Sequence, residues 1–310
     1  MSLIEEVRAA CRQVAEGASY VHVAREAIPA YAASLPLEQA VCPAHDPHTH
    51  YLGHGADTVA FFLTLDAINF GSGYFPHLRK RSGLSGYFTV AASLNERFQA
   101  RGPLTAQELA ALWPEDCARL VGQALANPPI AELMQLFASA LQDLGRYLLE
   151  CFAGSFTALV EAAGGSAAEL VRLLVAMPFY NDVEPYGALQ VPFYKRAQLT
   201  AADLALAFGG QGWGRFRDLD RLTIFADNLV PHVLRVDGIL HYEPELAARI
   251  DREELVAAGS AQEVEIRACA VHAVELMVES LRGMGRAVTA QGLDFLLWNR
   301  GQQPAYKARP

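Results

Sequence analysis

Two carboxylic acids of this 310-residue chain lie inside segments that otherwise carry mostly apolar residues. Asp227 follows Phe225 in LTIFADNLVPHVL, and Asp294 lies in TAQGLDFLLWNRG. A pair of acids in one apolar pocket can serve as acid and base, because burial and mutual repulsion separate their pKa values. Two structural carboxylates held by helix-end amides would produce the same pattern. From the residues alone, both interpretations stay open.

A group of cationic and aromatic residues forms a second candidate site. In VPFYKRAQLTAADL, Tyr194 is followed by Lys195 and Arg196. Two adjacent cations indicate either a clamp for a phosphate or carboxylate, or solvated side chains with their stems against the protein. Arg267 lies in VEIRACAVHAV, where an unpaired guanidinium would be costly. Its expected partner is the ligand or an acid such as Glu265.

A third candidate is the loop HDPHTHYLGH, which carries four histidines. His-x-His can place two imidazoles on one metal ion, as in metal-dependent hydrolases, with Asp46 as an oxygen ligand. The rest of the chain offers no obvious further set of ligands. We therefore prefer a polar loop in which one or two histidines contact a ligand. The histidines are His45, His48, His50 and His54.

Helices must supply most of the framework that positions these residues. Three segments begin with a hydroxyl residue followed three positions later by glutamate, the pattern of a helix-start capping box. Amphipathic helices are also predicted for LIEEVRAACRQVAEG and YVHVAREAIPAYAASL, and a long helical stretch runs from IAELMQLF to Gly164-Gly165. The three capping boxes are Thr105–Glu108, Ser166–Glu169 and Ser260–Glu263.

Strand signals are few, so the chain is predicted to be mainly α with little β. YGALQVPFY alternates weakly, and GYFTVAASL is a second possible strand. No interdomain linker is evident. We expect a single helical domain over residues 1–310, with N-terminal helices and the histidine-rich loop in 1–55 and the helical core in 56–310.

Composition limits the classes of function. With 52% hydrophobic and 19% charged residues the chain is not disordered. A net charge of −9 argues against a dedicated nucleic-acid partner, since a protein that binds nucleic acid needs a surplus of lysine and arginine.

The five cysteines contain no CxxC pair, so neither a disulfide framework nor a zinc ribbon is predicted. The N-terminus lacks the features of a signal peptide, and no apolar run reaches the ~20 residues that cross a bilayer, so a cytoplasmic protein without membrane partners is expected.

Several segments, taken together, resemble the queuosine salvage family of queuosine 5′-phosphate N-glycosylases. They are VPFYKRAQLTAADL, DLDRLTIFADNLVPHVLRVDGILHY, AQEVEIRACAVHAVELM and GLDFLLWN, with LDAINFGSGYF and GYFTVAASLNERF upstream. The resemblance implies a helical fold related to helix-hairpin-helix DNA glycosylases, with no metal and no redox cofactor. It also implies hydrolysis of the N-glycosidic bond of queuosine 5′-monophosphate, which releases queuine for salvage into tRNA modification.

The resemblance places the family's catalytic carboxylate on Asp227. A carboxylate in dry surroundings stabilises the positive charge that grows on C1′, or attacks that carbon. The resemblance gives base binding to Phe225, Asp294, Trp298 and a histidine, for which His48 is the first choice ahead of His50 and His54. Lys195 is expected to hold the 5′-phosphate, assisted by Tyr194, Arg196 or Arg267.

Two other classes of function remain as alternatives. One is a metal-dependent hydrolase built on HDPHTH. The other is a non-catalytic protein that binds a modified nucleotide or tRNA, against which the acidic net charge counts.

Overall fold

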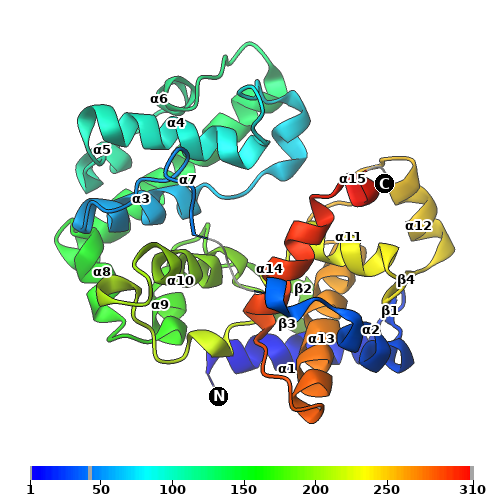
Figure 1. Ribbon diagram of the computed structural model, residues 1–310. Helices are drawn as coiled ribbons and strands as arrows, with labels where there is room; N and C mark the ends of the chain where they lie inside the picture. Colours follow the sequence, from blue (N-terminus) through cyan, green and yellow to red (C-terminus); the bar gives the residue numbers. More distant parts are fainter. Residues whose placement is uncertain (1, 41–43, 308–310) are drawn as a thin grey trace. The chain divides into compact units, whose positions relative to one another are not determined.

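The computed structural model describes residues 2–40 and 44–307, and these form mainly helices (Figure 1). The strands of the described residues make two small antiparallel sheets of two strands each. The predicted mainly α class is therefore confirmed. The relation to helix-hairpin-helix glycosylases stays a prediction. Within the described residues, none of the helices combines the length and apolar character needed to span a membrane.

The chain divides into two compact units. Unit 1 joins three segments, Met1–Pro43, Asp182–Gln198 and Asp218–Pro310, and unit 2 joins Ala44–Asn181 and Leu199–Arg217. The single domain expected from the sequence, with its division after residue 55, stays a prediction.

Unit 1 is built around α13 (Ala261–Gly283), which contacts α1, α2, α11 and α14 (Figure 1). This helix is apolar on several faces because it is surrounded, and its buried residues include Val264, Ala268, Val271, Val274, Met277 and Leu281. The other helices of unit 1 are α1 (Leu3–Gly17), η1 (Arg25–Ala27), α2 (Ile28–Ser34), η2 (Leu37–Gln39), η5 (Leu219–Arg221), α11 (Leu229–Val236), α12 (Pro244–Asp251), α14 (Ala290–Gly301) and α15 (Pro304–Lys307).

Both sheets belong to unit 1. Strand β1 (Val21–Val23) pairs with β4 (Leu240–Tyr242), and β2 (Val183–Tyr186) forms a hairpin with β3 (Leu189–Pro192). The hairpin contacts α1 and α13 and leads directly into α10 (Lys195–Ala207), whose first turn belongs to unit 1.

Unit 2 centres on α7 (Pro128–Phe152), which buries one face against α3, α5, α6 and α8. A β-carbon at Gly145 would lie 2.4 Å from the backbone nitrogen of Ala110, so glycine there permits the close approach of α5 and α7. The other helices of unit 2 are α3 (Ala56–Ala67), η3 (Ser72–His77), α4 (Gly86–Arg101), α5 (Ala106–Ala110), α6 (Pro114–Leu120), α8 (Phe156–Ala162), α9 (Ala167–Leu174) and η4 (Gly212–Gly214).

The predicted helix starts are largely confirmed. Thr105 and Glu108 form the complete capping box. Ser166 and Ser260 each accept the backbone N–H of the glutamate three positions on, at 3.2 and 3.3 Å. The glutamates of these two segments bind arginines instead of completing the box, because Arg172 and Arg267 lie within one turn of them.

Three element predictions were wrong in part. Residues 20–35 do not form one helix: Val21–Val23 is a strand, because it finds a partner in β4, and a separate short helix begins at Ile28 with Pro29 in its first turn. GYFTVAASL is the beginning of α4, capped by Ser85, and not a strand. The long stretch that ends at Gly164-Gly165 is interrupted at Ala153, whose φ of 51° is left-handed and ends α7. YGALQVPFY, by contrast, does contain a strand, β3.

Candidate functional site

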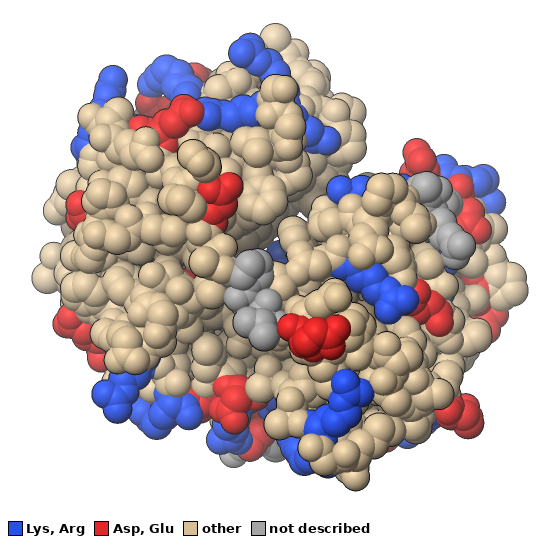
Figure 2. Space-filling model, in the orientation of Figure 1, with Lys and Arg blue, Asp and Glu red and all other residues tan. Residues whose placement is uncertain are grey.

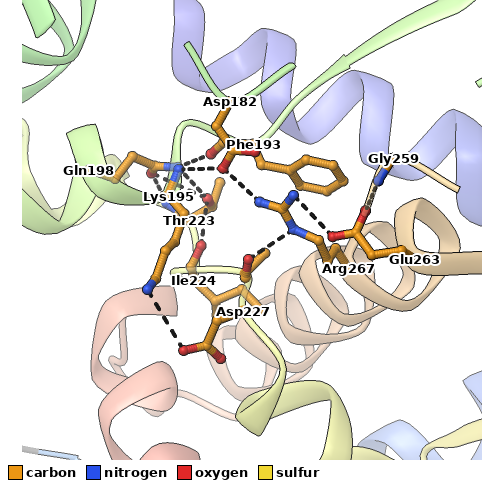
Figure 3. A network of polar contacts seen from close by, with 11 residues as sticks. Asp182, Phe193, Lys195, Gln198, Thr223, Ile224, Asp227, Gly259, Glu263 and Arg267 are labelled. Carbon is orange, nitrogen blue, oxygen red and sulfur yellow. Dashed lines mark hydrogen bonds and ion pairs between the residues drawn. The ribbon is translucent and has the colours of Figure 1, made fainter. Parts of the chain in front are cut away.

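Asp227 lies in the loop immediately before α11, with 25% of its side chain exposed. Its Oδ1 accepts a hydrogen bond from the backbone N–H of Leu229 at 2.9 Å, one of the amides that a helix start leaves without an intrahelical partner. Its Oδ2 lies 4.0 Å from the Nζ of Lys195 (Figure 3). The carboxylate is thus oriented by a helix start and faces a cation, while part of it remains open to solvent.

Asp294, on α14, is buried in the same unit and is 6% exposed. Its Oδ1 accepts the backbone N–H of Phe225 at 2.9 Å. Burial, reinforced by the negative charge of Asp227, raises the pKa of Asp294 well above its usual range, although the Phe225 N–H and Lys195 act in the opposite direction. Asp294 therefore holds its proton more tightly than an exposed carboxyl does, and it lies beside a second acid that faces a cation.

Two aromatic side chains accompany Asp294. Phe225 is joined to it through its backbone, and Trp298 follows it by one helical turn on α14. Both are half-buried, so each leaves part of its surface accessible. Aromatic surfaces of this kind can stack on a nucleobase.

The predicted cationic cluster begins α10. Lys195 is its first residue, with 20% of its side chain exposed, and its backbone N–H donates to the Oδ2 of Asp182 at 3.2 Å. Arg196 is half-buried, and its charge acts on Asp182 as well. Tyr194 is buried, with a left-handed φ of 49°, and burial raises the pKa of its hydroxyl. The structure brings Lys195 of this cluster directly to Asp227.

Arg267 has protein partners on all three of its nitrogens. Nη2 donates to Asp182 at 2.6 Å, Nη1 to Glu263 at 3.3 Å, and Nε to the carbonyl of Ala226 at 3.0 Å (Figure 3). Its guanidinium carbon also lies 3.9 Å from the centre of the Phe193 ring. Burial tends to raise the pKa of Asp182, but the Arg267 charge and hydrogen bond outweigh it and hold that pKa below its usual value.

The suggested Arg267–Glu265 pair was wrong. The Oε1 of Glu265 instead accepts the N–H of Ser19 at 3.1 Å and the hydroxyl of Tyr186 at 2.7 Å. Its Oε2 accepts the backbone N–H groups of Tyr20 and Val21 at 2.6 and 3.0 Å. Glu265 therefore binds the backbone entering β1, and Asp182 is the acid that the sequence did not identify.

The histidine-rich loop belongs to unit 2. His48 is exposed, and its backbone N–H donates to Asp46 at 2.9 Å. His50 is buried, with Nε2 3.1 Å from the hydroxyl of Tyr87, and burial lowers its pKa. The His45 ring lies 4.5 Å from that of His50, and burial followed by His50 lowers its pKa to about 3. His54 stacks on Tyr51 at 3.9 Å.

These contacts do not favour the metal-dependent alternative. Across residues 2–40 and 44–307, no group of three or more histidine, cysteine, aspartate or glutamate side chains is arranged to hold a metal ion. His45 and His50 make contacts typical of histidines in a protein core. A base contact by His48 stays a prediction.

Two cavities in the described part of the chain are lined by residues outside the Asp227 cluster. One, of about 400 Å³, is lined by the loop from Arg79 to Ser82 and by Thr89 on α4. The other, of about 230 Å³, lies between α1 and α13 and is lined by Arg8, His272 and Glu275 among others.

The expected absence of a nucleic-acid partner stays a prediction. On the face that Figure 2 shows, lysine and arginine side chains lie interspersed with aspartate and glutamate. A nucleic-acid surface instead gathers its cations along a continuous tract that follows the phosphates.

Comparison with known proteins places the chain in a family. Residues 49–309 match the family model described as queuosine salvage protein. A queuosine 5′-phosphate N-glycosylase/hydrolase of Sphaerobacter thermophilus is 38% identical over 298 residues, which cover 94% of this chain and 91% of the relative.

Eukaryotic proteins of the same name are also similar. The one from Dictyostelium discoideum is 32% identical over 255 residues, covering 82% of this chain and 75% of the relative. The one from Bos taurus is 34% identical over 224 residues, which cover 69% of this chain and 65% of the relative. Because the family model matches residues 49–309 and the bacterial relative aligns along nearly the whole length, the chain belongs to the queuosine salvage protein family.

Proposed function

We propose that this chain hydrolyses the N-glycosidic bond of queuosine 5′-monophosphate and releases queuine. The relatives named above support the substrate and the reaction. The observation that carries the proposal is the pair of acids in unit 1. Asp227 faces Lys195, and Asp294, whose pKa is raised by burial, is joined to the same loop through Phe225.

Asp227 acts on the sugar. Cleavage builds positive charge on C1′ and the ring oxygen while the bonding electrons move into the base. A carboxylate beside C1′ stabilises that charge, or adds to C1′ and is then displaced by water. One such electrostatic group lowers the activation free energy by about 3 kcal/mol, which raises the rate about a hundredfold. Its hydrogen bond to Leu229 fixes the carboxylate before substrate arrives, so little reorganisation is needed.

Asp294 recognises the base. The side arm of queuine carries a secondary amine that is cationic at neutral pH, and a buried acid is a suitable partner for it. In the free protein burial and the charge of Asp227 raise the pKa of Asp294 and so favour its protonated form. A bound ammonium reverses that balance, so Asp294 gives up its proton when the base binds. Phe225 and Trp298 stack on the flat ring system, each contributing about 1–3 kcal/mol.

Lys195 holds the 5′-phosphate, with Tyr194 and Arg196 beside it. Its ammonium lies 4.0 Å from the Asp227 carboxylate, and 20% of the Lys195 side chain is exposed. A phosphate there completes a charge-assisted pair, which is worth more than a neutral hydrogen bond. The same lysine thus relates the position of the phosphate to that of the carboxylate.

Mass spectrometry of queuosine 5′-monophosphate incubated with the purified protein tests the proposal. We expect free queuine and ribose 5-phosphate in equal amounts. The matched control is Asp227→Asn, which keeps the shape of the side chain and the acceptor for Leu229. Intact substrate after incubation with folded wild-type protein would contradict the proposal. Equal turnover by the control would remove Asp227 from it.

A further inference from the structure

Lys195 and Asp227 contact each other directly, and they are also joined by a chain of hydrogen bonds through Asp182 and Arg267. The Oδ2 of Asp182 accepts the backbone N–H of Lys195 at 3.2 Å and the Nη2 of Arg267 at 2.6 Å. The Nε of Arg267 donates to the carbonyl of Ala226 at 3.0 Å, and Ala226 immediately precedes Asp227. Figure 3 shows the resulting closed ring of contacts, with the Lys195–Asp227 ion pair on one side and Arg267 on the other.

Asp182 holds the start of α10 in place with its backbone carbonyl as well as with its carboxylate. Its backbone carbonyl accepts the N–H groups of Phe193 and Tyr194 at 2.9 and 3.3 Å. Tyr194 has a φ of 49°, a conformation that a residue with a side chain adopts at a cost unless its surroundings enforce it. Asp182 therefore holds three consecutive backbone amides and so determines where the Lys195 side chain leaves the backbone.

Arg267 holds the Asp227 loop in place, and its other hydrogen bonds to the protein restrict the movement of its side chain. Its side chain is 12% exposed and that of Asp182 is 17% exposed, so their ion pair is largely screened from water. Glu263 and the Phe193 ring hold the remaining sides of the guanidinium. A group whose three nitrogens already donate to the protein is poorly suited to bind the phosphate of a substrate.

We propose that Arg267 and Asp182 are positioning residues that set the distance between the Lys195 ammonium and the Asp227 carboxylate. This inference rests on the proposed function, in which Lys195 holds the phosphate and Asp227 acts at C1′. Both groups must keep their places at once, because an error of about 1 Å in placing a reacting group can cost a hundredfold in rate. A planar guanidinium can donate to Asp182 and to the Ala226 carbonyl in fixed directions, and a lysine ammonium cannot reproduce that geometry.

A separate contact keeps the surroundings folded when the ring is broken. The Gln198 side chain donates to Thr223 Oγ1 at 2.9 Å and accepts the Thr223 N–H at 2.9 Å. It joins α10 to the segment before Asp227 without involving Arg267. We therefore expect Arg267→Lys and Asp182→Asn to remain folded, with a less well-defined Lys195–Asp227 distance.

Steady-state kinetics distinguish positioning from phosphate binding. For Arg267→Lys and Asp182→Asn we expect kcat to fall about tenfold to a hundredfold, with KM for queuosine 5′-monophosphate within about threefold of wild type. The matched control is Arg172→Lys, which alters an exposed ion pair between Arg172 and Glu169 on α9 of unit 2. We expect its kcat to match wild type. A large rise in KM at unchanged kcat would make Arg267 a phosphate ligand and overturn the proposal, as would wild-type values for both constants.

The side-chain resonance of Lys195 in a nuclear magnetic resonance spectrum tests the same inference without any turnover of substrate. The chain has three lysines, Lys80, Lys195 and Lys307, so the side-chain resonances of lysine-labelled protein can be assigned with Lys195→Arg. At fixed pH, Asp227→Asn will shift the Lys195 resonance, and Asp182→Asn, which adds no lysine to the chain, will shift it by a smaller amount, while Lys80 stays unchanged. An unmoved Lys195 resonance in Asp182→Asn would overturn the proposal. Absence of turnover by wild-type protein would instead contradict the proposed function and leave this measurement to decide the inference.

Discussion

The Asp294 carboxylate accepts the backbone N–H of Phe225 at 2.9 Å, two residues before Asp227. One hydrogen bond thus connects a buried acid on α14 to the loop that carries a partly exposed one. The two acids differ in solvation, and this difference gives them different chemistry. Burial and its neighbour's charge raise the pKa of Asp294, whereas Asp227 has a helix-start amide and a lysine as partners.

The stability of the protein will depend on pH through Asp294. Its pKa is raised in the fold above the usual 3.8, so the folded protein binds this proton more tightly than the unfolded chain does. The stabilising contribution is fully present below the usual pKa and is lost as pH rises through the raised one. Asp294→Asn keeps the acceptor for Phe225 without the charge.

Denaturant unfolding of Asp294→Asn and wild type between about pH 4 and pH 8 measures this effect. We expect the variant to gain stability relative to wild type as pH rises. Parallel stability curves over that interval would show that Asp294 ionises normally in the fold.

Binding of queuine will release a proton. If Asp294 is neutral in the free protein and ionised beside the ligand's ammonium, affinity rises with pH until the raised pKa is reached. Calorimetric titration in buffers of different ionisation enthalpy counts the protons released per base bound. We expect a value close to one for wild type and close to zero for Asp294→Asn. Equal proton release by both proteins would assign the proton to another group.

Removing the Lys195 ammonium will weaken recognition of the phosphate selectively. A hydrogen bond to a charged group contributes about 1.5–3 kcal/mol, so Lys195→Ala should weaken binding of ribose 5-phosphate about tenfold or more. Binding of queuosine without its phosphate should change little. Lys80→Ala, which removes a lysine on the exposed loop of unit 2, is the matched control. Equal losses for both ligands in Lys195→Ala would show that this lysine does not bind the phosphate.

The sequence predicted those parts of the site whose signals are local. An acid inside an apolar segment and a pair of cations before a helix can each be recognised within a dozen residues, and Asp227, Asp294 and Lys195 do lie together in unit 1. The need of Arg267 for an anion was also predictable, because a guanidinium inside an apolar helix is costly without one.

The identity of that anion was not predictable. Asp182 is one of 34 acidic residues and lies 85 positions before Arg267, so only the fold could select it over the nearby Glu265. The β1–β4 pairing was missed for the same reason, since Val21 and Tyr242 are far apart in sequence. A segment such as VHV becomes a strand only when its partner is present, because pairing and burial override weak local propensity.

The most direct test of the central claim is the single-turnover rate of queuine release by Asp227→Asn, measured beside its affinity for queuine. Loss of the negative charge of Asp227 beside C1′ should lower the rate about a hundredfold or more, while the affinity for queuine stays within about threefold of wild type. A rate near that of wild type, at unchanged affinity, would contradict the account.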